Sequence, residues 1–370
     1  MKYLISGGGT GGHIFPAVSI ANALREADPN CEILFVGALG RMEMERVPQA
    51  GYDIIGLPVK GLNRKQIWRN LRVVIDFIRS MLLVRKIIRD FRPDVGIGVG
   101  GYASGAAMKV AAKMGVPILL QEQNGFAGVT NKFLKNDAKK ICVAYEGMER
   151  FFPKEKIILT GNPVRQNLTS GTKSEAIKYF NEEFGVNFTA ECKTLLIIGG
   201  SLGAGTINQS IIAHLQEIAA SGVQVIWQTG KNYFSDCKVA LSVLNDQSSN
   251  IICTDFVSQM PLAYALSDLV ISRAGASSIS ELCLLGKPSI LVPSPNVAED
   301  HQTHNALALV RKDAAILVKD VDAKDQLISK ALALIQDDAR LQNLHDNVLT
   351  LALPNSARII AEEVMKLARR

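Results

Sequence analysis

Short apolar runs that end in glycines constrain the fold of this chain most. Each run is rich in Ile, Val and Leu and precedes a helical pattern, as expected for buried strands of a parallel sheet flanked by helices. The runs form two sets: YLIS, EILFVG, DVGIGVG, PILLQ and KICVA, then TLLIIGG, VQVIWQTG, NIICTDF, LVISRAG and SILVP. The two sets open alike, with YLISGGGTGGH and TLLIIGGSLGAG. The sequence therefore predicts an α/β protein with two facing, Rossmann-like, doubly wound parallel-sheet domains.

The boundary between these domains is expected where Gly161-Asn162-Pro163 breaks regular structure and a polar stretch follows. We place the first domain at residues 1–165 and the second at residues 166–353. After Pro354, apolar residues recur at helical spacing, which predicts a terminal helix within residues 354–370. We expect this helix to pack back on the first domain.

Composition excludes several classes of protein. With 48% hydrophobic and 21% charged residues, the chain is neither disordered nor collagen-like. The longest uncharged stretch, residues 194–216, is interrupted by glycines and polar residues, so no membrane-spanning helix is expected. The apolar start MKYLIS is too short for a signal peptide, which favours a cytoplasmic protein with reduced cysteines. The net charge of +6 is too small to indicate a nucleic-acid partner.

The glycine-rich turns predict a site for an anionic ligand. Gly7, Gly9 and Gly12 fit G-x-G-x-x-G after a strand, a pattern that aims backbone N–H groups at a phosphate. A nicotinamide dinucleotide would also need an acid at the end of the second strand, where Gly37 stands instead. Further clusters follow other strands: 98–102, 199–205 and 273–276. Any one turn can serve strand–helix packing alone, but the set favours a cleft lined with backbone donors, for an anion carrying sugar groups.

A series of motifs spans nearly the whole chain. They are GGGTGGHIFPA (7–17), GGY (100–102), QEQN (121–124), GNPVR (161–165), GGSLGA (199–204), RAGA (273–276) with Ser280-Glu281, and DHQTHNA (300–306). Their combination and order resemble one family, the N-acetylglucosaminyltransferases of peptidoglycan synthesis, which convert lipid I to lipid II.

The resemblance implies a glycosyltransferase B fold, with the nucleotide in the second domain and the acceptor in the first. It implies transfer of N-acetylglucosamine from UDP-N-acetylglucosamine to the 4-hydroxyl of the muramoyl sugar of undecaprenyl-pyrophosphoryl-MurNAc-pentapeptide, with inversion at the anomeric carbon. No metal or other cofactor is implied. The alternatives are a related transferase with another lipid acceptor such as diacylglycerol, a dinucleotide-dependent oxidoreductase, and a silent sugar-nucleotide-binding protein.

On the acceptor side, His13 is the candidate catalytic residue. It is either the base that deprotonates the acceptor hydroxyl or a positioning group for the acceptor pyrophosphate. The structural alternative is that it only caps the helix. The resemblance adds the following contacts to substrate: Thr10, Gly11, Gly12, Asn124 and Arg165. For Arg165, a salt bridge across the domain junction is the structural alternative.

On the donor side, Ser201 is placed to bind the leaving diphosphate, or else to cap a helix. Glu281 matches the family's ribose-binding glutamate, against the alternative of a surface or capping carboxylate. Gln302 and Asn305, three residues apart on a predicted helix, are expected to face sugar hydroxyls together. The resemblance adds Ala276, and also Val257 in a segment with Phe256 that contacts uracil through backbone groups.

Two patterns resemble metal-binding motifs but are not expected to bind a metal. His301 and His304 lack a third ligand for zinc. Asp320-Val321-Asp322 has the D-x-D form of metal-dependent transferases, but it lies far along the chain from the glycine turns, so we expect a solvated turn.

The segment between Lys60 and Arg92 is basic and amphipathic. Helical spacing gathers Ile67, Leu71, Val74, Ile75, Ile78 and Leu82 on one face, with Arg69, Arg72, Asp76 and Arg79 opposite and Trp68 and Phe77 widening the apolar arc. Basic residues gain roughly 1 kcal/mol each near an anionic bilayer. We expect a membrane face (Trp68, Arg69, Arg72, Phe77, Arg79) that binds the cytoplasmic leaflet of the inner membrane peripherally, where cell-wall synthesis proteins are possible partners. The alternative is a core helix with a solvated basic side.

Overall fold

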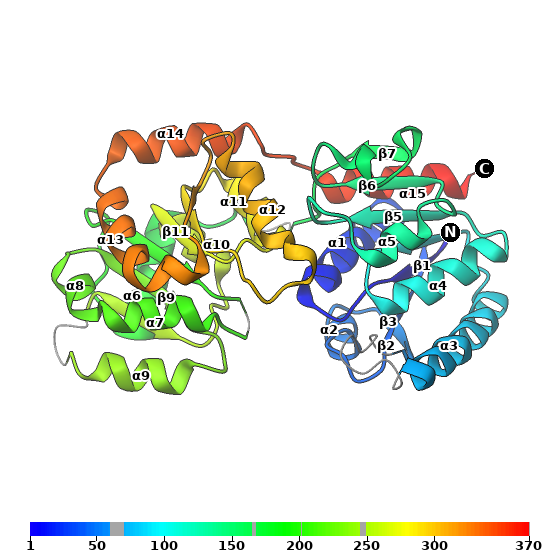
Figure 1. Cartoon of the computed structure of the whole chain (residues 1–370), viewed down its shortest axis with the longest axis horizontal. Coiled ribbons are helices and arrows are strands. Elements are labelled where there is room, and N and C mark those ends of the chain that lie inside the picture. Colours follow the sequence, from blue (N-terminus) through cyan, green and yellow to red (C-terminus); the bar gives the residue numbers. More distant parts are fainter. Residues whose placement is uncertain (60–69, 165–167, 201, 245–248, 370) are drawn as a thin grey trace. The chain divides into compact units, whose positions relative to one another are not determined.

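The computed structural model describes residues 1–59, 70–164, 168–200, 202–244 and 249–369 (Figure 1). The chain divides into two compact units, the first made of residues 1–165 and 353–370 and the second of residues 166–352. Each unit has its own sheet and its own buried core. The predicted α/β class with doubly wound parallel sheets is confirmed.

The first unit is built on a seven-stranded parallel sheet in the order β3-β2-β1-β4-β5-β6-β7. Its strands are β1 (Lys2–Ser6), β2 (Glu32–Ala38), β3 (Asp53–Leu57), β4 (Val95–Gly98), β5 (Ile118–Glu122), β6 (Lys140–Val143) and β7 (Ile157–Leu159). Its α-helices are α1 (Gly11–Ala27), α2 (Glu43–Gln49), α3 (Asn70–Phe91), α4 (Tyr102–Lys113), α5 (Val129–Leu134) and α15 (Ser356–Ala368). The strands that sequence analysis missed, β3 and β7, lie at the two edges of the sheet and are partly exposed, although their apolar residues, IIGL and IIL, are consecutive.

Helix α15 belongs to the first unit although it follows the whole of the second in sequence. It packs against α1, and Ile360 and Val364 are fully buried in the same core cluster as Ile5 and Ile20. Figure 1 shows α15, in red, beside the strands of this unit. The core of the first unit is therefore completed from the far end of the chain.

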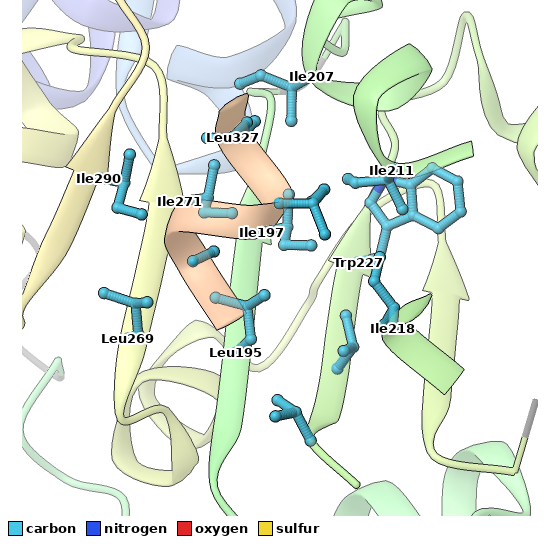
Figure 2. Packing of buried hydrophobic residues seen from close by; sticks show 14 of the residues in the cluster. Leu195, Ile197, Ile207, Ile211, Ile218, Trp227, Leu269, Ile271, Ile290 and Leu327 are labelled. Carbon is cyan, nitrogen blue, oxygen red and sulfur yellow. The ribbon is translucent and has the colours of Figure 1, made fainter. Parts of the chain in front are cut away.

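The second unit has a six-stranded parallel sheet in the order β10-β9-β8-β11-β12-β13. Its strands are β8 (Thr194–Ile198), β9 (Gln224–Gln228), β10 (Ile251–Thr254), β11 (Leu269–Ser272), β12 (Ser289–Leu291) and β13 (Ile316–Leu317). Its α-helices are α6 (Lys173–Phe184), α7 (Gly205–Ala213), α8 (Leu215–Ala220), α9 (Phe234–Ser242), α10 (Met260–Leu266), α11 (Ala276–Leu285), α12 (His301–Val310), α13 (Ala323–Ile335) and α14 (Asp338–Leu349). Figure 2 shows the core between sheet and helices, where Trp227 packs near Ile211 and Leu327 of α13 lies over the strands.

The strand order positions the glycine turns. In each sheet the order reverses between two neighbouring strands, β1 and β4 in the first unit and β8 and β11 in the second. Doubly wound sheets bind ligands beyond the carboxyl ends of the strands at such a switch point. The predicted turns follow these four strands, and in the first unit they touch, because a Cβ on Gly101 would overlap the Gly8 carbonyl.

Candidate functional site

A cavity of about 380 Å³ opens at the switch point of the second unit. Its lining comes from the turns after β8 and β11, the loops after β9 and β12, and one residue of α12: Gly199, Gly200, Gly203, Gly205, Tyr233, Arg273, Gly275, Ser278, Ser294, Asn296 and Gln302 among others. Ser201, predicted to bind the leaving diphosphate, is outside the described residues. Sequence analysis missed Tyr233 and Asn296, because both lie in loops without a glycine motif of their own.

The cavity has the donors that an anion requires. Helices α7 and α11 begin at Gly205 and Ala276, directly at its wall, so their first N–H groups and helix dipoles favour negative charge there. Arg273 adds a guanidinium to the lining. Its side chain is only 15% exposed, which strengthens its electrostatic effect relative to a solvated cation. This arrangement suits a diphosphate.

The expectation that Asp320 lies in a solvated turn is wrong. Asp320 does not lie in a solvated turn far from the glycine turns, because its side chain is only 17% exposed and forms an ion pair with Arg273. Its second carboxylate oxygen accepts a hydrogen bond from the hydroxyl of Thr206 at 2.9 Å. The D-x-D pattern was misread because strand order, which the sequence does not state, brings the end of β13 to the carboxyl edge of the sheet.

Gln302 and Asn305 lie on α12 in different environments. The Gln302 side chain lines the cavity, and its amide oxygen accepts from the backbone N–H of Ser294 at 2.9 Å. This bond fixes the orientation of the amide, so the Nε2 group of Gln302 points away from Ser294 and is the donor that a ligand could meet. Asn305 is fully buried and donates to the carbonyl of Ala274 at 3.3 Å, so it supports the turn after β11.

Glu281 and Val257 are not among the residues that line this cavity. Glu281, on α11, is 7% exposed and accepts a hydrogen bond from the hydroxyl of Tyr264 at 3.0 Å. Val257 is buried, whereas the neighbouring Phe256 is 52% exposed and its carbonyl accepts from Thr254. Ala276 is the first residue of α11. Sequence analysis missed Tyr264, which no local motif marks.

In the first unit, His13 lies in the first turn of α1. Its Nδ1 is 3.1 Å from the carbonyl oxygen of Gly8 and 3.3 Å from the hydroxyl of Thr10. Because a carbonyl only accepts, the bond to Gly8 places the proton on Nδ1 and makes Nε2 the basic atom of a neutral ring. Thr10 and Gly12 are exposed and Gly11 is half-buried at the same helix start, so these predicted contacts and His13 lie together.

The first glycine turn contains a buried carboxylate that sequence analysis missed. Glu43 of α2 is fully buried; its Oε2 accepts from the N–H of Gly9 at 2.9 Å and its Oε1 from the N–H of Ala38 at 3.0 Å. Side chains at Gly8 or Gly37 would overlap Glu43. The carboxylate therefore joins the first glycine turn to the end of β2 through the backbone N–H groups of Gly9 and Ala38.

Comparison with known proteins decides the family. Residues 3–143 match the glycosyltransferase family 28 N-terminal domain, and residues 194–362 match the glycosyltransferase family 28 C-terminal domain. The UDP-N-acetylglucosamine--N-acetylmuramyl-(pentapeptide) pyrophosphoryl-undecaprenol N-acetylglucosamine transferase of Bacteroides fragilis is 58% identical over 100% of this chain and 96% of its own length. The Bacteroides thetaiotaomicron protein of the same name is also 58% identical, over 100% of this chain and 98% of its own. The chain belongs to glycosyltransferase family 28.

A solved structure supports the fold of this family 28 glycosyltransferase. The crystal structure of MurG from Acinetobacter baumannii aligns with a TM-score of 0.77 at 23% identity, covering 99% of each chain. The resemblance stated from the motifs and the glycosyltransferase B fold that it implied are both confirmed.

The loop that carries Asn124 is fixed by a buried glutamate. Glu122 accepts at Oε1 from the backbone N–H of Asn124 at 3.2 Å, and at Oε2 from Gly128 at 3.0 Å and Asn131 at 2.9 Å. Burial raises the pKa of the Glu122 carboxyl, and these hydrogen bonds oppose that rise. The family motif QEQN thus combines a predicted ligand contact with the side chain that holds its loop. Arg165, the other contact carried over from the family motifs, is outside the described residues.

Helix α3 exposes the apolar face that sequence analysis found. Ile75, Ile78 and Leu82 are 44%, 52% and 65% exposed. Phe77 does not belong to this face: it packs inward against the core, because the stripe that contains it continues into buried Val84 and Ile88. Trp68, Arg69 and the side chain of Arg72 are outside the described residues. The described part of α3 thus packs one stripe into the core, as the alternative of a core helix requires, and leaves the other stripe exposed.

Basic residues share the exposed side of α3. Arg79, Arg85, Lys86 and Arg89 are all exposed, and Arg79 lies one helical turn from Ile75 and Leu82 rather than opposite them. In the described part of the chain, no helix has the length and apolarity needed to cross a bilayer.

Proposed function

We propose that this glycosyltransferase transfers N-acetylglucosamine from UDP-N-acetylglucosamine to the 4-hydroxyl of the muramoyl sugar of undecaprenyl-pyrophosphoryl-MurNAc-pentapeptide, inverting the anomeric carbon and yielding lipid II. The observation that carries the proposal is the identity of 58%, over the full chain, with transferases of that name. The anion-binding cavity in the second unit supports it independently.

On the donor side, the cavity binds the diphosphate. As the sugar–phosphate bond breaks, negative charge grows on the departing UDP, and donors fixed in advance stabilise it without reorganising. The starts of α7 and α11 and Arg273 supply such donors. Glu281 binds the ribose hydroxyls, and Gln302 donates from Nε2 to the sugar.

On the acceptor side, His13 acts on the attacking hydroxyl. With its Nδ1 proton held by Gly8, the ring presents Nε2 as the atom that accepts the hydroxyl proton while the oxygen attacks the anomeric carbon. If His13 instead positions the acceptor pyrophosphate, the protonated ring makes that contact. Thr10 and the N–H groups of Gly11 and Gly12 bind the same acceptor.

UDP release tests this function. We would measure release from UDP-N-acetylglucosamine with a soluble lipid I analogue, with diacylglycerol, and without acceptor, for the wild type, His13→Ala and His13→Gln. The expected result is release that requires the lipid I analogue and falls at least a hundredfold in both variants, with donor binding retained. Release with diacylglycerol alone would identify the other acceptor, and donor binding without release would indicate a silent binding protein.

A membrane role of α3 completes the proposal. The enzyme binds the anionic cytoplasmic leaflet through the exposed side of α3, where Ile75, Ile78 and Leu82 insert and Arg79 and Lys86 pair with lipid headgroups. Such docking brings the enzyme to a lipid-linked acceptor and makes it a peripheral protein of the inner membrane, where other cell-wall synthesis proteins are potential partners.

Vesicle flotation tests this membrane face. Reversing charge at Arg79 and Lys86 together is expected to weaken binding to anionic vesicles more than tenfold, since each basic residue contributes about 1 kcal/mol. The matched control reverses Lys324 and Lys330, two exposed lysines of the second unit. Equal binding of wild type to neutral vesicles, or equal losses in both double variants, would contradict the proposal.

A further inference from the structure

The carboxylate of Asp320 joins two walls of the cavity. One oxygen pairs with Arg273, which follows β11, and the other accepts the hydroxyl of Thr206 at 2.9 Å. Thr206 is the second residue of α7, whose start lines the cavity from the turn after β8. Both members of the ion pair are mostly shielded from water. A single side chain from the end of β13 thus contacts both elements that supply the cavity's donors.

One guanidinium nitrogen of Arg273, Nη1, makes several hydrogen bonds that fix the side chain. Besides Asp320, its Nη1 lies 3.1 Å from the carbonyl of Val292 and 3.3 Å from that of Pro293, where the chain leaves β12. These carbonyls are neutral, so Asp320 supplies the charged partner in this set. Because charge-assisted hydrogen bonds are about twice as strong as neutral ones, the carboxylate has the largest influence on where the guanidinium lies.

We propose that Asp320 is a positioning residue for the diphosphate subsite. It acts through Arg273 and Thr206, keeping the guanidinium and the start of α7 at fixed places on the cavity wall before the ligand arrives. A long side chain that must first be ordered loses part of its binding energy to lost rotamer freedom, whereas a prepositioned one does not. This inference rests on the proposed function, because it takes the cavity to be the site of the donor diphosphate.

The test uses UDP and uridine as probes of the full-length enzyme. Calorimetric titration of Asp320→Asn is expected to show UDP binding about tenfold weaker than wild type, the range typical of coupled polar pairs, and uridine binding within twofold. Loss confined to the ligand that carries phosphates is not expected from general damage to the domain. Asp322→Asn removes the same charge two residues away, at the residue before α13, and serves as the control.

A double-mutant cycle separates positioning from independent effects. In an Arg273→Met background, Asp320→Asn is expected to weaken UDP binding by no more than about threefold, since only its contact with Thr206 remains. Undiminished UDP binding by Asp320→Asn, an equal loss for uridine, or an unchanged effect in the Arg273→Met background would each overturn the inference.

Two further results keep the outcome interpretable. If the wild type does not bind UDP, the proposed function fails, and the positioning role fails with it. If the wild type binds UDP and Asp320→Asn binds it equally, the positioning role alone fails.

A second variant is available should Asp320→Asn not fold. Thr206→Val breaks the other contact of the carboxylate while keeping the ion pair. It is expected to weaken UDP binding about threefold, because the start of α7 loses its hydrogen bond to the carboxylate, and wild-type affinity would overturn the inference.

Discussion

At the scale of single residues, the orientation of Glu281 depends on a tyrosine seventeen residues earlier. The Tyr264 hydroxyl donates to Glu281 Oε2 at 3.0 Å, and both side chains are buried. A carboxylate that is to accept hydrogen bonds from two ribose hydroxyls needs a fixed rotamer. Tyr264 therefore belongs to the proposed nucleotide site although it does not line the cavity.

The prediction concerns ribose recognition. Tyr264→Phe is expected to weaken UDP binding about fivefold to tenfold, because Glu281 loses a buried hydrogen bond worth about 1–1.5 kcal/mol. Titration with UDP and with 2′-deoxy-UDP should show that the preference for UDP shrinks. Tyr179→Phe, which removes an exposed hydroxyl 3.3 Å from Ser258, is the control and should keep wild-type affinity. An unchanged preference in Tyr264→Phe would show that Glu281 is oriented by other contacts.

Lys287 gives the second unit a pH-dependent stability. Burial lowers the pKa of its ammonium group from 10.5 to about 8, although it donates to the carbonyl of Ser267 at 2.8 Å. Between these two pKa values the unfolded chain binds the proton and the folded chain does not, so the free energy of unfolding rises as pH increases from about 8 to 10.5.

Lys287→Met is expected to remove this rise, which amounts to at most about 3 kcal/mol. Urea unfolding at several pH values between 7.5 and 10.5, followed by Trp227 fluorescence in a Trp68→Phe background, would measure it. Subtracting the variant's profile from the wild type's isolates Lys287 from thiols and phenols that titrate in the same range. Parallel profiles would contradict the assignment.

The positions of site residues were predictable from sequence only where a local pattern marks them. The glycine clusters 199–205 and 273–276 and Gln302 stand in compact motifs, and the structure places residues of each around one cavity. Glu43, Tyr264 and Asp320 act on residues 34, 17 and 47 positions away. Contacts at such separations depend on strand order, which no short motif encodes.

At the scale of elements, the first glycine turn is shaped by the carboxylate that it encloses. Gly8→Ala is expected to lower the free energy of unfolding by about 1–3 kcal/mol, because the new methyl group would overlap Glu43. Gly12→Ala is the control: its nearest neighbour is 3.7 Å away and it lies in α1, where alanine is favoured over glycine. Chemical denaturation of both variants measures the difference. Equal stability would show that Glu43 moves aside freely.

Two elements show the limits of periodicity. In α3, the stripe Ile75, Ile78 and Leu82 and the stripe Phe77, Met81 and Val84 both have helical spacing, and spacing alone does not say which one faces the core. The second stripe, Phe77, Met81 and Val84, is the one that packs against the core. Sequence analysis also missed the edge strands β3 and β7, although their apolar residues, IIGL and IIL, are consecutive.

At the scale of the whole molecule, the first unit depends on α15. Ile360→Ala is expected to destabilise this unit by about 2–4 kcal/mol, because the side chain is fully buried between α15 and the core. The second unit, with a separate core, should be unaffected.

Two signals separate the units. In a Trp68→Phe background, Trp227 fluorescence reports the second unit, while far-ultraviolet circular dichroism reports both. Ile360→Ala should shift part of the dichroism transition to lower denaturant and leave the fluorescence midpoint in place. Arg358→Ala, at an exposed position of the same helix, should shift neither. A moved fluorescence midpoint would mean that the two units unfold together.

The discontinuity of the first unit sets an order of events during synthesis. A ribosome that has translated residue 352 has produced every residue of the second unit, but the first unit still lacks the helix that covers α1. The second unit is therefore the earlier of the two to have its complete core available, although the first began to emerge before it. Until residues 353–370 leave the exit tunnel, an apolar surface around Ile5 and Ile20 is open to solvent and to chaperones that bind such surfaces.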